Sequence, residues 1–207
     1  MTSLIEWINR LSAWASTPAV WGLFVTGAVI YIVSQWHVRL VALLTQYFLL
    51  GILFSRLFAD RPEMALVKML VGWLICGALH LSARIREEVE PRRAPKQGWA
   101  EVPFRLVTLA ALTVGAALAA QHYPLPFVPP DLTLACYLLG VLAFLFIGTE
   151  TDAVVVGVGL LNLLAALDIF YSAQDPAILV TGMILIVELL IGLVISYLAV
   201  GQAEVEG

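Results

Sequence analysis

The sequence predicts an all-α, polytopic membrane protein with about seven transmembrane helices. Of its 207 residues, 61% are hydrophobic and only 13% are charged, and the mean hydropathy is +0.96. A soluble domain does not need so apolar a composition. The apolar residues also gather in stretches of about 17–25 residues, the length with which a helix crosses a bilayer. The expected spans are Ala19–Gln35, Leu40–Phe58, Pro62–Ala83, Phe104–Gln121, Leu132–Thr149, Ala153–Ser172 and Pro176–Val200.

Residues 1–18 precede the first span and are predicted to form an amphipathic helix at the membrane interface. The apolar residues recur at helical spacing, and polar residues take the opposite face. Those apolar residues are Leu4, Trp7, Ile8, Leu11 and Trp14. The same helix could instead pack on a neighbouring subunit.

The starts of two spans carry helix-capping signals. Thr17-Pro18 and Asp175-Pro176 each place a capping side chain before a proline at the first helical position. The span at residues 104–121 is rich in alanine and glycine, which favour close helix packing over contact with lipid.

The connecting segments indicate the orientation of the chain. Residues 84–103 form a charged, proline-broken loop, which reads as either a solvated linker or a docking surface, and residues 201–207 form a short tail. Lys and Arg residues outside the spans number three on the side of the N-terminus and seven on the other side. The positive-inside rule therefore predicts an external N-terminus, with the 84–103 loop and the C-terminus in the cytoplasm.

The chain is predicted to contain the same three-helix unit twice. Arg39 follows Gly27 by 12 residues, and Asp152 follows Gly140 by the same distance. A proline opens the third helix of each unit. Since a single span separates the two units, they would cross the membrane in the same direction, as parallel repeats. The first unit, the linker helix and the second unit cover residues 19–83, 104–121 and 131–200.

Two polar residues are predicted near the middle of the membrane. Glu188 is the only charged residue between Pro176 and Gly201. A carboxylate at that depth costs about 2.5–3.5 kcal/mol on insertion scales, so it is expected to have a partner, a hydrated path or a proton to move. Asn162 lies at a similar depth, and we expect an Asn162–Glu188 hydrogen bond. Glu188 is interpreted either as a proton-handling group or as a protonated acid that only holds helices together.

Lys68 and Asp168 are predicted to form an ion pair that links the two units. At 1.5 Å per residue, both lie roughly 6–9 Å below the outer edge, closer in depth to each other than to Glu188. The alternative for Lys68 is that its amine extends to the interface. His80 lies at the inner end of its span, either as an interfacial residue or as a group that passes protons to nearby acids. Gln46 adds one more polar group in the second span.

No cofactor is expected in this chain. The sequence contains no P-loop, dinucleotide-binding, zinc-protease or haem-attachment motif. Cys76 and Cys136 both fall inside apolar runs and show no metal-binding spacing, so they read as small apolar residues. The three histidines are far apart and make no metal site. Nothing indicates a nucleic-acid partner.

Two segments of the second unit resemble a known family. Residues 187–193 read VELLIGL, similar to the third-helix pattern of the small K-type membrane subunit of complex I, in which Glu188 takes the place of the glutamate. Residues 159–166, GLLNLLAA, resemble the second helix of that subunit, although its glutamate is replaced by Leu161. Two such units joined by a linker helix resemble the E-type membrane component of hydrogenase-4 and formate hydrogenlyase complexes.

The resemblance implies a non-catalytic membrane-arm subunit of a complex I-related, energy-converting redox complex. Such a subunit would contribute to proton (or cation) translocation in a bacterial or archaeal inner membrane. Quinone, flavin, nickel or iron–sulfur chemistry would belong to partner chains, and the partners would be antiporter-like membrane subunits with soluble redox subunits at the cytoplasmic side. The alternatives are a subunit of a multi-chain cation/proton antiporter, a stand-alone transporter, and a purely structural or assembly subunit. Glu188, Lys68, Asp168, Asn162 and His80 are the candidate residues for a proton path or its coupling.

Overall fold

The computed structural model describes residues 17–58, 61–89, 101–175 and 177–206, which fold into helices without any strand. Six of these helices are long and apolar enough to cross a membrane, and α2 is a shorter apolar helix. The prediction of an all-α, polytopic membrane protein is therefore confirmed. The helices are α2 (Thr17–Ile32), α3 (Trp36–Leu57), α4 (Glu63–Val89), α5 (Glu101–His122), α6 (Pro130–Thr149), α7 (Ala153–Gln174) and α8 (Ile178–Glu206).

Several helices extend beyond the limits predicted for the spans. The loop predicted at residues 84–103 is shorter, because α4 continues to Val89 and α5 begins at Glu101. The sequence between Arg84 and Val89 consists of helix-compatible residues without glycine or proline, so nothing stops the helix at the membrane surface. The tail predicted at residues 201–207 is also helical as far as Glu206, although it begins with Gly201. The helix predicted for residues 1–18 lies outside the described residues, apart from the two that open α2.

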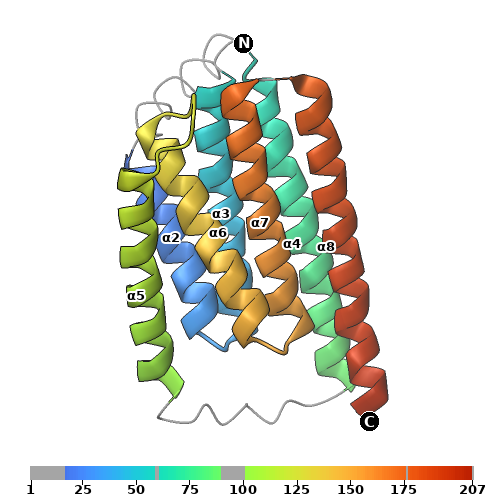
Figure 1. Ribbon diagram of the computed structural model, residues 1–207. Helices are drawn as coiled ribbons and strands as arrows, with labels where there is room; N and C mark the ends of the chain where they lie inside the picture. Colours follow the sequence, from blue (N-terminus) through green and yellow to red (C-terminus); the bar gives the residue numbers. More distant parts are fainter. Residues whose placement is uncertain (1–16, 59–60, 90–100, 176, 207) are drawn as a thin grey trace.

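The helices form a bundle in which six surround a common core and α5 lies at one side (Figure 1). Going around the bundle, each helix contacts the next in the order α2, α3, α4, α8, α7, α6 and back to α2, and α3 also touches α7 across the middle. α5 contacts only α6 and α2 closely. Each of α2, α3 and α4 thus contacts its counterpart among α6, α7 and α8. This arrangement fits the predicted division into two three-helix units, which stays a prediction.

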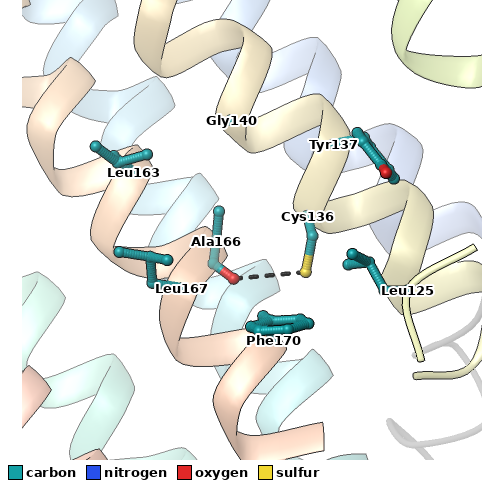
Figure 2. A pocket seen from close by; sticks show the side chains of 8 residues that line it. All are labelled: Leu125, Cys136, Tyr137, Gly140, Leu163, Ala166, Leu167 and Phe170. Carbon is teal, nitrogen blue, oxygen red and sulfur yellow. Dashed lines mark hydrogen bonds between the residues drawn. The ribbon is translucent and has the colours of Figure 1, made fainter. Parts of the chain in front are cut away.

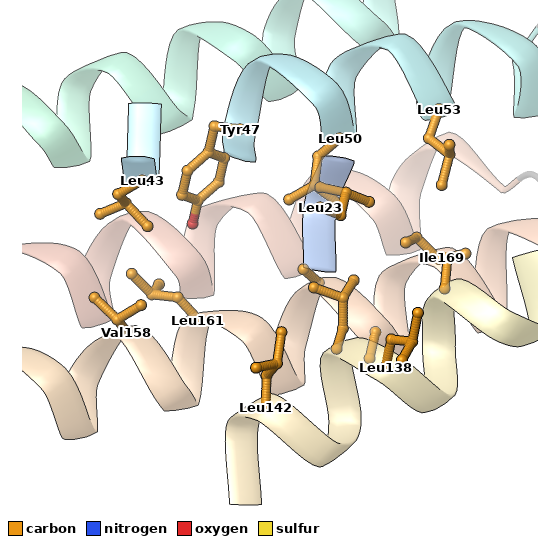
Figure 3. Close-up of a cluster of buried hydrophobic side chains, with 14 of the residues drawn as sticks. Leu23, Leu43, Tyr47, Leu50, Leu53, Leu138, Leu142, Val158, Leu161 and Ile169 are labelled. Atoms are coloured by element: carbon orange, nitrogen blue, oxygen red, sulfur yellow. The ribbon is translucent and has the colours of Figure 1, made fainter. Parts of the chain in front are cut away.

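Apolar side chains fill the centre of the bundle. Figure 3 shows Leu23 of α2, Leu50 of α3, Leu142 of α6 and Leu161 of α7 pointing into one buried cluster. Because lipid is as apolar as these side chains, close packing rather than exclusion of water stabilises such a core. Gly192 illustrates this, since a methyl group there would lie only 2.7 Å from the Ile75 side chain. Glycine therefore allows α8 to approach α4.

An ion pair links two helices at each end of the bundle. Near the start of α7, Arg39 Nη1 lies 3.5 Å from Asp152 Oδ2, and Asp152 also caps α7 by accepting a hydrogen bond from the backbone N–H of Val154. At the opposite end, Arg56 pairs with Asp131 in the first turn of α6. Both pairs join residues 19–83 to residues 131–200, so charge as well as packing holds these two parts together.

Candidate functional site

A lysine and two carboxylates form a charged cluster inside the bundle. Lys68 on α4 places its Nζ atom 2.7 Å from Asp168 Oδ2 on α7 and 2.6 Å from Glu188 Oε1 on α8. All three side chains are 0% exposed. The predicted Lys68–Asp168 pair is therefore confirmed. The alternative in which the Lys68 amine extends to the interface is wrong, because two carboxylates hold it inside.

Glu188 completes this cluster, which the comparison of depths did not predict. Measured from the end of the bundle where α4 and α8 begin, Lys68 lies roughly 8 Å deep and Glu188 roughly 15 Å deep. Those depths describe the backbone only. Both residues have long side chains, and α4 packs directly against α8. The side chains therefore bridge a separation in depth that had argued against a contact.

The predicted hydrogen bond between Asn162 and Glu188 is wrong. Asn162 Oδ1 instead accepts a hydrogen bond from Gln46 Nε2 at 2.6 Å. The reason is that α3 crosses α7 in the middle of the bundle, which brings Gln46 opposite Asn162. Both amide side chains are buried. Gln46, which the sequence shows only as an isolated polar residue, thus belongs to a second polar pair inside the membrane domain.

Polar contacts continue from the charged cluster towards the C-terminal end of α7. Ser172 Oγ lies 3.4 Å from Asp168 Oδ1, to which it donates, and 3.2 Å from the Thr181 hydroxyl. On the other side of the lysine, the Phe54 ring lies 5.0 Å from Lys68 Nζ, where the face of the ring favours a cation. These neighbours fix the positions of Lys68 and Asp168 without adding a second positive charge.

Tyr47 is a buried polar residue that sequence reasoning missed. It points from α3 into the apolar cluster (Figure 3) and is 2% exposed. Its ring packs directly on α4 at Gly72, where a Cβ atom would overlap the ring. Gly72 lies one helical turn after Lys68, so its missing side chain opens the space that Tyr47 fills beside the cluster. That glycine is the only trace of the contact in the sequence.

The charges of the cluster do not balance. Two carboxylates share one ammonium group, so the fully ionised cluster would carry one net negative charge in a buried place. An uncompensated buried charge is costly, and such groups commonly take up a proton instead. A proton on Asp168 or Glu188 would make the cluster neutral while keeping an ion pair. The arrangement can therefore bind and release one proton at low cost compared with an isolated acid.

His80 lies outside this cluster. It is exposed in the C-terminal half of α4, where its ring centre is 5.5 Å from that of Trp36. Glu150 and Asp152, two acids that could accept a proton from His80, have other partners, because Glu150 pairs with Arg105 and Asp152 pairs with Arg39. The interfacial interpretation of His80 fits these contacts better than a proton-transfer role.

A separate apolar groove of about 230 Å³ lies between α6 and α7 (Figure 2). Cys136 lines it and donates a hydrogen bond from Sγ to the backbone oxygen of Ala166 at 3.4 Å. Most of the other side chains that line it are apolar, among them Leu125, Leu163 and Phe170. The hydroxyl of Tyr137, which also lines the groove, donates a hydrogen bond to the backbone oxygen of Tyr123. Within the described parts of the chain, no three His, Cys, Asp or Glu side chains gather as a metal site.

No protein-family model, curated protein or solved structure matches the chain. The interpretation of the site therefore depends on the chemistry of its own residues.

Proposed function

We propose that this chain is a membrane-arm subunit of a complex I-related, energy-converting redox complex. In this proposal the cluster of Lys68, Asp168 and Glu188 takes part in proton translocation, and the redox chemistry belongs to partner chains. The observation that carries the proposal is the excess of one buried carboxylate over the single buried ammonium. A group that only held helices together would be served by a balanced pair.

The geometry supports a simple change in the partners of the Lys68 ammonium when Glu188 gains or loses a proton. With both carboxylates ionised, the ammonium is shared at 2.7 and 2.6 Å. When Glu188 gains a proton, its attraction for Lys68 falls and the ion pair with Asp168 remains. When Glu188 loses that proton, the ammonium is shared again. Because Lys68 is on α4 and Glu188 is on α8, the occupancy of the proton would change the force between these two neighbouring helices.

The same proposal implies a location, an orientation and neighbouring subunits for the chain. The chain would lie in a bacterial or archaeal inner membrane with its N-terminus outside and its C-terminus in the cytoplasm, and its neighbours would be antiporter-like subunits. Side chains exposed on α4 and α8, such as Trp73 and Leu190, are apolar and suit lipid or another membrane subunit. The same cluster would serve a cation/proton antiporter without a redox arm, which is the second candidate.

Replacement of Glu188 by Gln tests the proton role. The assembled complex is reconstituted into vesicles, and proton movement is measured together with its redox turnover. We expect Glu188→Gln to assemble but to lose most of its proton translocation. The matched control is Glu150→Gln, which changes a glutamate paired with Arg105 outside the cluster and should translocate normally. Normal translocation in assembled Glu188→Gln complexes would refute the proposal and leave a structural role.

Purification through a C-terminal tag tests the assignment to a complex. The chain is extracted from native membranes in mild detergent, and co-purifying proteins are identified by mass spectrometry. Antiporter-like subunits together with iron–sulfur or hydrogenase chains are the expected result. Antiporter-like subunits without redox chains would favour the antiporter, and a lone monomer or homodimer would exclude both.

A further inference from the structure

Four buried polar atoms near the charged cluster have no hydrogen-bond partner within the described protein. They are Gln46 Oε1, Tyr47 Oη, Asn162 Nδ2 and Glu188 Oε2. The side chains that carry them are between 0% and 3% exposed. Leaving a buried donor or acceptor unsatisfied costs about 1–3 kcal/mol, so four such atoms together need an explanation.

The four atoms belong to residues at one level of the bundle. Counted from the outer ends of their helices, the four residues lie roughly 15–18 Å deep. Gln46 and Tyr47 are on α3, Asn162 is on α7 and Glu188 is on α8. α3 contacts α7, and α7 contacts α8. Gln46 is hydrogen-bonded directly to Asn162. Tyr47 packs on α4 at Gly72, one helical turn after the lysine that binds Glu188.

The hydrogen-bonding character of these atoms is complementary to water. Asn162 Nδ2 and the Tyr47 hydroxyl supply two unused donors, whereas Gln46 Oε1 and ionised Glu188 Oε2 supply two unused acceptors. One water molecule accepts two hydrogen bonds and donates two. Exchanging oxygen and nitrogen in both amides preserves their mutual bond and again leaves one donor and one acceptor free. A cation fits less well, because it would face the amide donor.

We infer that this level of the bundle is a binding site for ordered water that joins the Gln46–Asn162 pair to Glu188, with Tyr47 holding the water in place. Buried waters typically make about three hydrogen bonds to otherwise unsatisfied groups, as here. The site exists whether or not a proton moves. If the proposed function is also correct, this water is the group next to Glu188 that receives or supplies its proton.

Infrared spectroscopy of the full-length protein in lipid nanodiscs tests this inference. Ordinary water is exchanged for oxygen-18 water, and the isotope-sensitive O–H stretching bands of weakly exchanging internal water are recorded. We expect such a band in the wild type and its loss or shift in Tyr47→Phe, which removes only the hydroxyl. Asn162→Ala is a second variant that should change the same band. Tyr31→Phe is the control, because Tyr31 is a buried tyrosine whose hydroxyl interacts with Thr149 elsewhere.

The outcomes distinguish this inference from the proposed function. An internal-water band that is absent, or identical in the wild type and both cluster variants, would overturn the water site. A band that changes when sodium and potassium are replaced by choline would overturn it in favour of a bound cation. If the water depends on Tyr47 but Glu188→Gln translocates protons normally, the site stands and the proposed function fails. If the water band does not depend on Tyr47 but Glu188→Gln loses proton translocation, the proposed function stands and the water site fails.

Discussion

Replacement of Lys68 by Met removes the only ammonium of the charged cluster while keeping a side chain of similar length. At the observed N–O separations of 2.7 and 2.6 Å, each contact is worth roughly 6 kcal/mol of Coulomb energy at an effective dielectric constant of about 20. Removing the charged groups from water offsets much of that attraction. Breaking a buried ion pair therefore has a net cost of about 3–5 kcal/mol, because the carboxylates are left without compensation.

The assay is the free energy of unfolding of the purified chain in mixed detergent micelles. We expect Lys68→Met to lose about 3–5 kcal/mol near neutral pH. Since the variant can recover by protonating both carboxylates, its deficit should shrink as the pH is lowered. Adding Asp168→Asn and Glu188→Gln to the variant should restore much of the loss for the same reason, because the buried negative charges are then gone.

The ion pair of Arg56 and Asp131, near the C-terminal end of α3, provides the matched control. The Arg56 side chain is 44% exposed, so Arg56→Met should cost about 1 kcal/mol or less. A cost for Lys68→Met that is no larger than this control, or a triple variant as unstable as the single one, would refute the reasoning about buried charge.

Two further predictions concern the packing of α4 and the start of α7. Gly72→Ala should destabilise the chain by about 1–3 kcal/mol in the same assay, because the added methyl group overlaps the Tyr47 ring; Gly77→Ala on the same helix meets nothing within 4 Å and should be neutral or stabilising. Asp152→Ala removes both the cap of α7 and the partner of Arg39, and it should cost about 1–2 kcal/mol. Asp152→Asn retains a capping oxygen, so a full loss in that variant would contradict the capping argument.

Much of the fold follows from the lengths of the apolar segments. Six of the expected spans became long apolar helices, because unpaired backbone groups are not tolerated in lipid and the helix satisfies them within the segment. The residues at which the helices end were less predictable. Hydropathy marks where the membrane stops, whereas helix propensity marks where the helix stops. Between Arg84 and Val89 the chain has left the apolar segment but still favours a helix.

The charged cluster was only partly predictable. Asp168 was assigned to Lys68 correctly because the two residues lie at similar depths. Depth along a helix says nothing about which helices are neighbours, and it ignores the reach of side chains. Asn162 was therefore given the wrong partner, and the contact between Lys68 and Glu188 was missed. Tyr47 resembles any aromatic residue in an apolar helix until the contact with α4 is known.

In the ion pairs between the two three-helix segments, residues 19–83 and 131–200, each sign of charge always comes from the same segment. Among the described residues, the cations come from residues 19–83 and the carboxylates come from residues 131–200. The contacts are Arg39–Asp152, Arg56–Asp131, Lys68–Asp168 and Lys68–Glu188. Two copies of either segment would supply only one partner of each of these ion pairs. Unlike charges therefore favour contact between the two different segments.

This polarity also explains why the excess charge of the cluster is negative. The second segment supplies two acids to the site, and the first segment supplies a single base. The position in the first segment that corresponds to Glu188, counted from the prolines at 62 and 176, is Leu74, which is 52% exposed and faces away from the core. The first segment therefore provides one cation to the cluster, and the second provides the two acids that share it.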